Sequence, residues 1–107
     1  MKMIKVSKKI IEPHEILYLE SRGNYTMFYL LDNKTEMSSF TLQIFEEKLK
    51  DYNFYRVNRS QIINFSEIKL FDSTCEQLNI FLKNGLQFSV SRRRRKLFEN
   101  HQSLFVS

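Results

Sequence analysis

Short alternations of apolar and polar residues recur through the first third of the chain. The strand-like runs are 4–6, 10–11, 16–20 and 25–31. Breaks at Glu12-Pro13-His14, Arg22-Gly23-Asn24 and Asp32-Asn33 separate or end these runs. Alternation with period two is typical of half-buried strands, and Gly, Pro and Asn are typical of the turns between them. The pattern therefore predicts a series of short strands.

The next segment changes to a helical period. Leu42, Phe45 and Leu49 recur at i, i+3 and i+7, with charged residues between them. Thr41 is a residue type that caps helix N-termini. We predict an amphipathic helix over about 41–52, ending near Asn53.

Strand patterns return in the second half. The segment 54–64 mixes apolar positions with a dense polar set, and the runs 68–71, 77–82 and 86–90 resemble strands. Asn84-Gly85 favours a tight hairpin between the last two runs. Ser91 can cap a short terminal helix over about 91–101, with Leu97 and Phe98 available for docking. The order strands, helix, strands, helix makes the expected fold mostly β.

Composition limits the architecture. The 107 residues give room for one domain over 1–107, and 42% hydrophobic residues with only two Gly and one Pro indicate a chain that folds by itself. No apolar run is longer than 27–31, far below the roughly 20 residues of a membrane span. Cys75 is the only cysteine, so no internal disulfide can form. We expect a soluble cytoplasmic protein without membrane association.

The charge is positive and unevenly distributed. Seventeen Lys and Arg against twelve Asp and Glu give a net charge of +5, which favours polyanionic partners but also occurs in proteins that bind none. Residues 1–11 contain four lysines and no acid, and 92–96 are five consecutive basic residues. Such patches are more informative than the net charge.

The basic run 92–96 follows Ser91 at the start of the predicted terminal helix. A helix N-terminus already carries a partial positive charge, so each cation there costs about 0.3 to 1 kcal/mol. An anion would offset that cost, since phosphate suits both the free N–H groups and the guanidinium forks. The alternative is a solvated basic tail.

Two further polar clusters could contact nucleic acid. In the segment 56–61, apolar Val57 can point inward while Arg, Asn, Ser and Gln supply hydrogen-bonding groups for base edges and phosphates. In the segment 20–25, Gly23 permits a tight connection that exposes Arg22 and Asn24 at its tip. Either cluster by itself could also be an ordinary turn.

Together these segments resemble the LytTR family of DNA-binding domains. Members carry an I-x-Y-x-E start followed by a loop and Tyr, an amphipathic helix, the motif F-x-R-x-[HN]-R-S-x-[IV]-[IV]-N, and [IV]-S-R. The corresponding residues here are Ile16-Leu17-Tyr18-Leu19-Glu20 with Tyr25, Leu42 to Leu49, Phe54-Tyr55-Arg56-Val57-Asn58-Arg59-Ser60-Gln61-Ile62-Ile63-Asn64, and Val90-Ser91-Arg92. The resemblance covers about 15–97.

The resemblance implies an elongated fold of small antiparallel sheets whose loops enter two successive major grooves of duplex DNA. By position, the base-contacting candidates are Asn24 or Tyr25, Arg59 and Arg92. The phosphate-contacting candidates are Arg22, Asn58, Ser60, Arg93 and Arg95. Arg56 and Asn64 could equally brace the backbone.

The chain departs from the family pattern at three points. Asn58 stands where His is common, and Arg94 and Arg95 lengthen a basic run that is often more mixed. Many members place a phosphate-accepting receiver domain upstream, whereas nothing here precedes Met1. The chain is therefore expected to be a stand-alone regulator or a piece of a longer protein.

Other functional classes fit less well. His14 and His101 belong to no catalytic or metal-ligand pattern, so we expect no enzyme, cofactor or metal. A single-stranded nucleic-acid binder could stack bases on aromatic residues such as Phe28, Tyr29, Phe81 and Phe88. A protein-interaction module is the third alternative. On duplex DNA, paired repeats could recruit a second copy of the chain.

Overall fold

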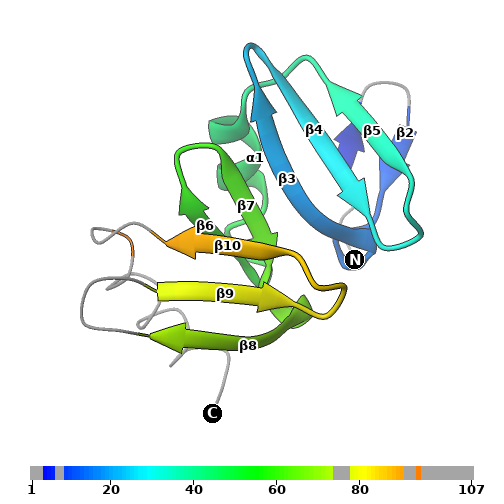
Figure 1. Cartoon of the computed structure of the whole chain (residues 1–107). Helices are drawn as coiled ribbons and strands as arrows, with labels where there is room; N and C mark the ends of the chain where they lie inside the picture. The colour runs from blue at the N-terminus through cyan, green and yellow to red at the C-terminus, as the bar shows by residue number, and fades with distance from the viewer. Residues whose placement is uncertain (1–3, 7–8, 74–77, 91–93, 95–107) are drawn as a thin grey trace.

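The computed structural model describes residues 4–6, 9–73, 78–90 and 94. Within them the fold is mostly β, as predicted (Figure 1). The first two strands, β1 (Ile4–Val6) and β2 (Lys9–Ile11), pair antiparallel with each other. A 3₁₀ turn at Pro13–Glu15 then leads into the central sheet.

The central sheet has five strands in the order β5-β4-β3-β7-β6, and every neighbouring pair is antiparallel. Its strands are β3 (Ile16–Arg22), β4 (Tyr25–Leu30), β5 (Thr35–Ser38), β6 (Phe54–Asn58) and β7 (Gln61–Asn64). Two hairpins, β3–β4 and β6–β7, therefore meet where β3 pairs with β7.

The helix α1 (Leu42–Lys48) covers one face of this sheet, seen behind it in Figure 1. Its apolar stripe contributes Leu42, Phe45 and Leu49, which are at most 4% exposed. Phe45 packs edge-on against Phe28, with ring centroids 4.7 Å apart. The first hydrophobic core comprises Ile11, Ile16, Leu19, Phe28, Leu42, Phe45, Leu49, Phe54 and Ile62.

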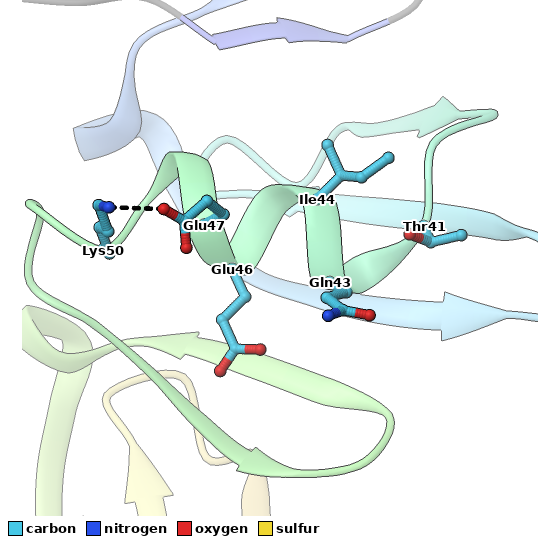
Figure 2. A pocket seen from close by; sticks show the side chains of 6 residues that line it. All are labelled: Thr41, Gln43, Ile44, Glu46, Glu47 and Lys50. Carbon is cyan, nitrogen blue, oxygen red and sulfur yellow. Dashed lines mark hydrogen bonds and ion pairs between the residues drawn. The ribbon is translucent and has the colours of Figure 1, made fainter.

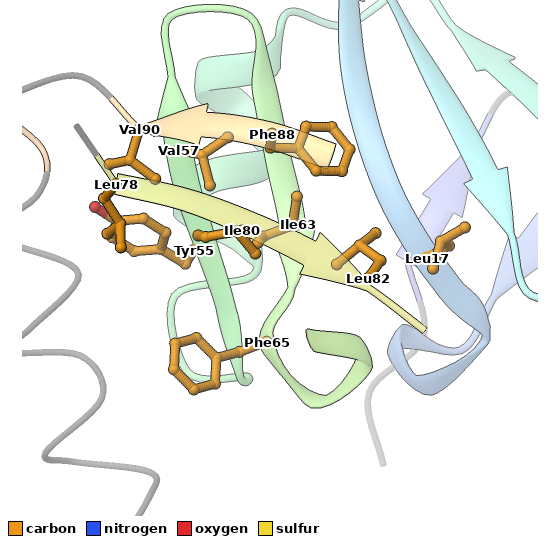
Figure 3. Close-up of a cluster of buried hydrophobic side chains, with 10 residues drawn as sticks. All are labelled: Leu17, Tyr55, Val57, Ile63, Phe65, Leu78, Ile80, Leu82, Phe88 and Val90. Carbon is orange, nitrogen blue, oxygen red and sulfur yellow. The ribbon is translucent and has the colours of Figure 1, made fainter. Parts of the chain in front are cut away.

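A second sheet covers part of the opposite face. A 3₁₀ turn at Phe65–Glu67 leads into three antiparallel strands in the order β10-β9-β8, which are β8 (Ile68–Ser73), β9 (Leu78–Leu82) and β10 (Gln87–Val90). Figure 3 shows the core between the two sheets. It comprises Leu17, Tyr55, Val57, Ile63, Phe65, Leu78, Ile80, Leu82, Phe88 and Val90.

The central strands serve both cores because successive side chains of a strand point to opposite faces. In β7, Ile62 packs in the first core and Ile63 in the second. In β6, Phe54 and Tyr55 divide in the same way. This explains why the segment 54–64 does not read as simple polar and apolar alternation.

The predicted helix over 41–52 is wrong at its C-terminal end, because α1 ends at Lys48. The Tyr52 amide donates to the Leu49 carbonyl at 2.9 Å, and the Phe54 amide donates to the Tyr52 carbonyl at 2.8 Å. These turns reverse the chain so that Phe54 reaches the first core. Thr41 is the N-cap residue, but its side chain makes no capping hydrogen bond.

The hairpin predicted at Asn84-Gly85 is present, with a three-residue loop. The Gly85 amide donates to the Leu82 carbonyl at 3.0 Å, and the Leu82 amide donates to the Leu86 carbonyl at 2.9 Å. Gly85 adopts a φ of 93°, which closes a turn of this kind without a side-chain clash. Strand β5 was not predicted, and the predicted terminal helix over 91–101 lies, apart from Arg94, outside the described residues.

Candidate nucleic-acid interface

The two hairpin turns lie side by side at one end of the central sheet. Antiparallel pairing aligns Glu20 with Gln61, so the C-terminal end of β3 adjoins the start of β7. The Ser21 amide donates to the Ser60 carbonyl at 2.7 Å. The β3–β4 turn and the β6–β7 turn consequently project from the same edge of the fold (Figure 1).

The first turn exposes the residues predicted to contact DNA. Arg22 pairs with Tyr25, and Gly23 with Asn24 forms the two-residue connection. Gly23 has a φ of 62°, and positive φ at the first central residue alone is the pattern of a type II′ hairpin turn. Asn24 is exposed, and Tyr25 is half exposed.

Arg22 is held in place although its side chain is 59% exposed. Its Nε donates to Glu20 Oε1 at 3.0 Å, and its Nη2 donates to the Tyr29 hydroxyl at 3.0 Å. The Tyr29 ring stacks on Tyr18, with centroids 4.3 Å apart. The hydrogen bonds to Tyr29 and then to Glu20 raise the pKa of Arg22, so the cation is permanent.

The second turn presents one cation at its tip. Arg59 and Ser60 are exposed, and the Arg59 guanidinium has no ion-pair partner within the described ranges. Asn58 is only partly exposed, and its amide donates to Gln61 Oε1 at 2.9 Å. Its Oδ1 accepts the Ser60 amide at 2.8 Å. Asn58 thus supports the turn from within, and its contact with phosphate stays a prediction.

Arg56 braces the same turn from the helix side of the sheet. Its Nε donates to the Asn58 carbonyl at 3.2 Å, and its Nη2 donates to the Arg59 carbonyl at 2.6 Å. Its Nη1 pairs with Glu46 Oε1 of α1 at 2.8 Å. Figure 2 shows Glu46 pointing from α1 toward the β6–β7 hairpin. Arg56 therefore braces the backbone by hydrogen bonds, as one of the two alternatives from the sequence expected.

Asn64 is likewise a structural residue. It is 5% exposed, its Nδ2 donates to the Ile16 carbonyl at 2.9 Å, and its Oδ1 accepts the Ser66 amide at 3.0 Å. The side chain thus joins the end of β7 to the start of β3 and caps the following 3₁₀ turn. It lies at the far end of these strands from the two hairpin turns.

The basic run is described only at Arg94. The Tyr55 hydroxyl donates to the Arg94 carbonyl, and Arg94 Nη1 donates to the Arg56 carbonyl at 3.5 Å. Both contacts tie Arg94 to β6, the strand that leads into the second turn. The predicted contacts Arg92, Arg93 and Arg95 lie outside the described residues.

Sequence reasoning missed the residues that connect the two turns. Glu20 Oε1 accepts from Arg22, whereas its Oε2 accepts from Gln61 Nε2 at 2.9 Å. Tyr29 holds the other side of the Arg22 guanidinium. Glu20 and Gln61 flank the two turns in the sequence, but only the register of β3 against β7 brings them together.

Burial counts against the aromatic surface of the single-strand alternative. Phe28 is fully buried, and Phe88 is 5% exposed. The ring of Tyr29 stacks on that of Tyr18, and Tyr18 packs edge-on against Phe88. Of the four aromatic residues considered for base stacking, Phe81 is the one that neither core nor ring stack occupies in the described structure.

Other surface features give little support for another kind of site. A hollow of about 570 Å³ beside α1 is lined by Thr41, Gln43, Ile44, Glu46, Glu47 and Lys50 (Figure 2), and its carboxylates do not suit a polyanion. Glu12, His14 and Glu15 lie close enough to share an ion, but such exposed groups often bind none. In the described part of the chain, α1 is too short to cross a membrane.

Comparison with known proteins agrees with this arrangement. The LytTr DNA-binding domain family matches residues 7–103. The chain is 32% identical over 87 residues to the sensory transduction protein LytT of Bacillus subtilis (strain 168), a match that covers 78% of the chain but 34% of that protein. The chain thus spans about a third of the length of this relative.

A solved structure shares the fold. It is the LytTr DNA-binding domain of a Bacillus cereus protein described as a methyl-accepting/DNA response regulator. The TM-score is 0.77 at 24% identity, and the match covers 94% of each chain. The family match, the sheet arrangement and the paired turns lead to one conclusion: the chain belongs to the LytTR family of DNA-binding domains.

Proposed function

We propose that this domain binds duplex DNA in a sequence-specific manner as the output module of a transcription regulator. The observation that carries the proposal is the pairing of β3 with β7, which places the two exposed polar turns at one end of one sheet. Turns projecting from a rigid sheet can reach base edges in the major groove without a recognition helix.

In this proposal the residues divide into base readers and phosphate contacts. Asn24 or Tyr25 of the first turn, Arg59 of the second and Arg92 of the basic run contact bases. An arginine fork can bond guanine O6 and N7 together, which gives Arg59 and Arg92 the chemistry of a reader. The turns and the basic run then enter successive major grooves on one side of the duplex.

The phosphate contacts set the register without reading sequence. Arg22, Ser60, Arg93 and Arg95 supply donors for this role, and Asn58 adds to it where its amide is freed from Gln61. If about five phosphates are neutralised, the logarithm of affinity falls against the logarithm of salt concentration with a slope of about −4 to −5.

The remaining features of the proposal concern the setting. The regulator acts in the cytoplasm, where the DNA is. Its target consists of paired direct-repeat half-sites, and side-by-side repeats of the site can recruit a second copy of the domain.

The test is selection of binding sites from random duplex DNA at near-physiological salt. The winning duplex is then titrated against a scrambled duplex and against its separate strands. Two short enriched half-sites about one turn apart support the proposal. A preference for single strands favours base stacking, and absence of any enriched duplex together with tight binding of a protein favours an interaction module.

The division of roles is tested by three substitutions on the selected site. Arg59→Ala and Arg92→Ala should relax discrimination at particular bases, whereas Arg95→Ala should weaken all sequences alike. Uniform loss of affinity in all three variants, with base preference unchanged, would show that the division is wrong.

A further inference from the structure

We infer that Glu20 is a positioning residue that sets the placement of the two DNA-reading turns relative to each other. It increases discrimination between sequences and lowers affinity for DNA in general. The inference rests on the proposed function, because it assumes that the turns around Asn24 and Arg59 contact the duplex.

The geometry forms a continuous chain of hydrogen bonds from one turn to the other. Glu20 Oε1 accepts Arg22 Nε at 3.0 Å, and Glu20 Oε2 accepts Gln61 Nε2 at 2.9 Å. Gln61 Oε1 then accepts Asn58 Nδ2 at 2.9 Å, and Asn58 Oδ1 accepts the Ser60 amide at 2.8 Å. Each of these four hydrogen bonds either lies within one turn or links the two turns.

The position of Glu20 allows these hydrogen bonds to restrict movement of one hairpin relative to the other. Its side chain is 24% exposed and lies in β3, which pairs with β4 in the first hairpin and with β7 of the second. Hydrogen bonds to an ionised group are stronger than those between neutral groups. The carboxylate therefore restricts the twist of one hairpin against the other at the end where both turns project.

The same carboxylate is unfavourable for binding any polyanion. It lies three residues from Gly23 and pairs with Arg22, one of the cations of this end. The Arg22 guanidinium also donates to Tyr29, so two of its donor atoms are occupied within the protein. Glu20 repels phosphate and occupies a cation at the end that binds DNA. Its presence there is explained if it fixes the two turns accurately relative to each other.

The experiment compares wild-type protein with Glu20→Gln, which keeps the size of the side chain and removes its charge. Asp32→Asn is the matched control. Asp32 accepts the Lys34 amide at 3.0 Å and lies near Lys34 Nζ, so it also pairs with a nearby cation. It follows β4 at the end of the sheet opposite to the two reading turns.

Each variant is titrated with the selected duplex and with a scrambled duplex over a range of salt. For Glu20→Gln we expect affinity for the scrambled duplex to rise about 2- to 5-fold, the range of one exposed charge interaction. The ratio of specific to scrambled affinity should fall about 5- to 10-fold, near the lower end of what one base contact supplies. If Arg22 gains a phosphate, the salt slope steepens by about one.

Gln61→Ala separates placement from charge. It removes the link between Glu20 and Asn58 but keeps the carboxylate and its bond to Arg22. We expect the discrimination ratio to fall without a rise in affinity for the scrambled duplex. This variant also decides the matter if Glu20→Gln does not fold, as judged by thermal unfolding.

The outcomes are distinct. Wild-type protein that does not discriminate between duplexes overturns the proposed function and this inference with it. If the wild type discriminates and both Glu20→Gln and Gln61→Ala keep its ratio, the inference alone is overturned. Equal effects of Glu20→Gln and Asp32→Asn would also overturn it, because they would reduce the role of Glu20 to net charge.

Discussion

Arg56 should determine the conformation of the second turn, and replacing it should disturb both stability and binding. Its guanidinium holds the carbonyls of Asn58 and Arg59 and the carboxylate of Glu46 at 3.2, 2.6 and 2.8 Å. The Arg56 side chain is only 18% exposed. Arg56→Ala removes all three contacts, whereas Arg56→Lys keeps the charge but not the planar fork.

The magnitude follows from how well water can replace these contacts. A hydrogen bond to a charged group contributes about 1.5 to 3 kcal/mol, but Glu46 is 44% exposed and the turn itself lies at the surface. Water therefore satisfies most groups that the arginine leaves, and the ion pair is worth at most about 1 kcal/mol. We expect Arg56→Ala to lower the free energy of unfolding by about 2 kcal/mol and Arg56→Lys by about 1 kcal/mol.

The assay is urea unfolding followed by titration of the selected and scrambled duplexes. Lys50→Ala is the control, because Lys50 lies just beyond the C-terminal end of the same helix, pairs with Glu47 at 2.5 Å in solvent and should leave stability almost unchanged. Both Arg56 variants should lose discrimination, since Arg59 is no longer oriented. An Arg56→Lys protein with wild-type stability and wild-type discrimination would show that the Arg56 fork does not hold the second turn.

Three further predictions concern single residues. Gly23→Ala should cost about 1 to 2 kcal/mol in unfolding free energy, because the backbone φ of 62° is strained for alanine although no atom lies within 4 Å of the added carbon; an unchanged urea midpoint would contradict this. Asn64→Ala should cost about 2 to 3 kcal/mol by leaving the Ile16 carbonyl and the Ser66 amide unpaired; a loss below about 0.5 kcal/mol in the same assay would count against it. Burial, and then Tyr29 and Glu20, raise the pKa of Tyr18 to about 12, so its stabilising contribution is present below pH 10 and lost as pH rises through 12. Ultraviolet titration should show a late-ionising tyrosine signal that disappears in Tyr18→Phe.

The parts of the fold that depend on local pattern could be predicted from the sequence. Leu42, Phe45 and Leu49 share one face of a helix whatever surrounds them, and Gly23 in its polar setting specifies a turn. The end of α1 could not be read in this way. It depends on Phe54 reaching the first core, which is a tertiary contact between distant elements.

The second core also exceeds what local pattern can show. Tyr55 and Ile63 carry apolar side chains toward a sheet that begins only at Ile68, and their neighbours Phe54 and Ile62 are buried on the other face. A strand buried on both faces loses the alternation that marks a half-buried one. The segment is therefore recognisable by its motif and not by its period.

The candidate site also has a part that the sequence predicts and a part that only the fold reveals. The exposed turn residues Asn24 and Arg59 could be proposed from composition and family resemblance. The connection through Glu20 and Gln61 depends on strand register, since a shift of β7 against β3 by one residue would place the two side chains on opposite faces of the sheet. Sequence shows which residues can contact DNA, whereas the register shows what keeps them in position.

Mapping the DNA-bound surface by backbone amide chemical shifts tests most directly whether the two turns read DNA. The wild-type domain is titrated with its selected duplex and, as a reference, with a scrambled one. We predict that the largest specific changes fall in Arg22–Tyr25 and Asn58–Ser60, with small changes along α1 and in the strands β8 and β9. Changes concentrated on α1 or on the three-stranded sheet, with the two turns unaffected, would contradict the claim that this end of the central sheet reads DNA.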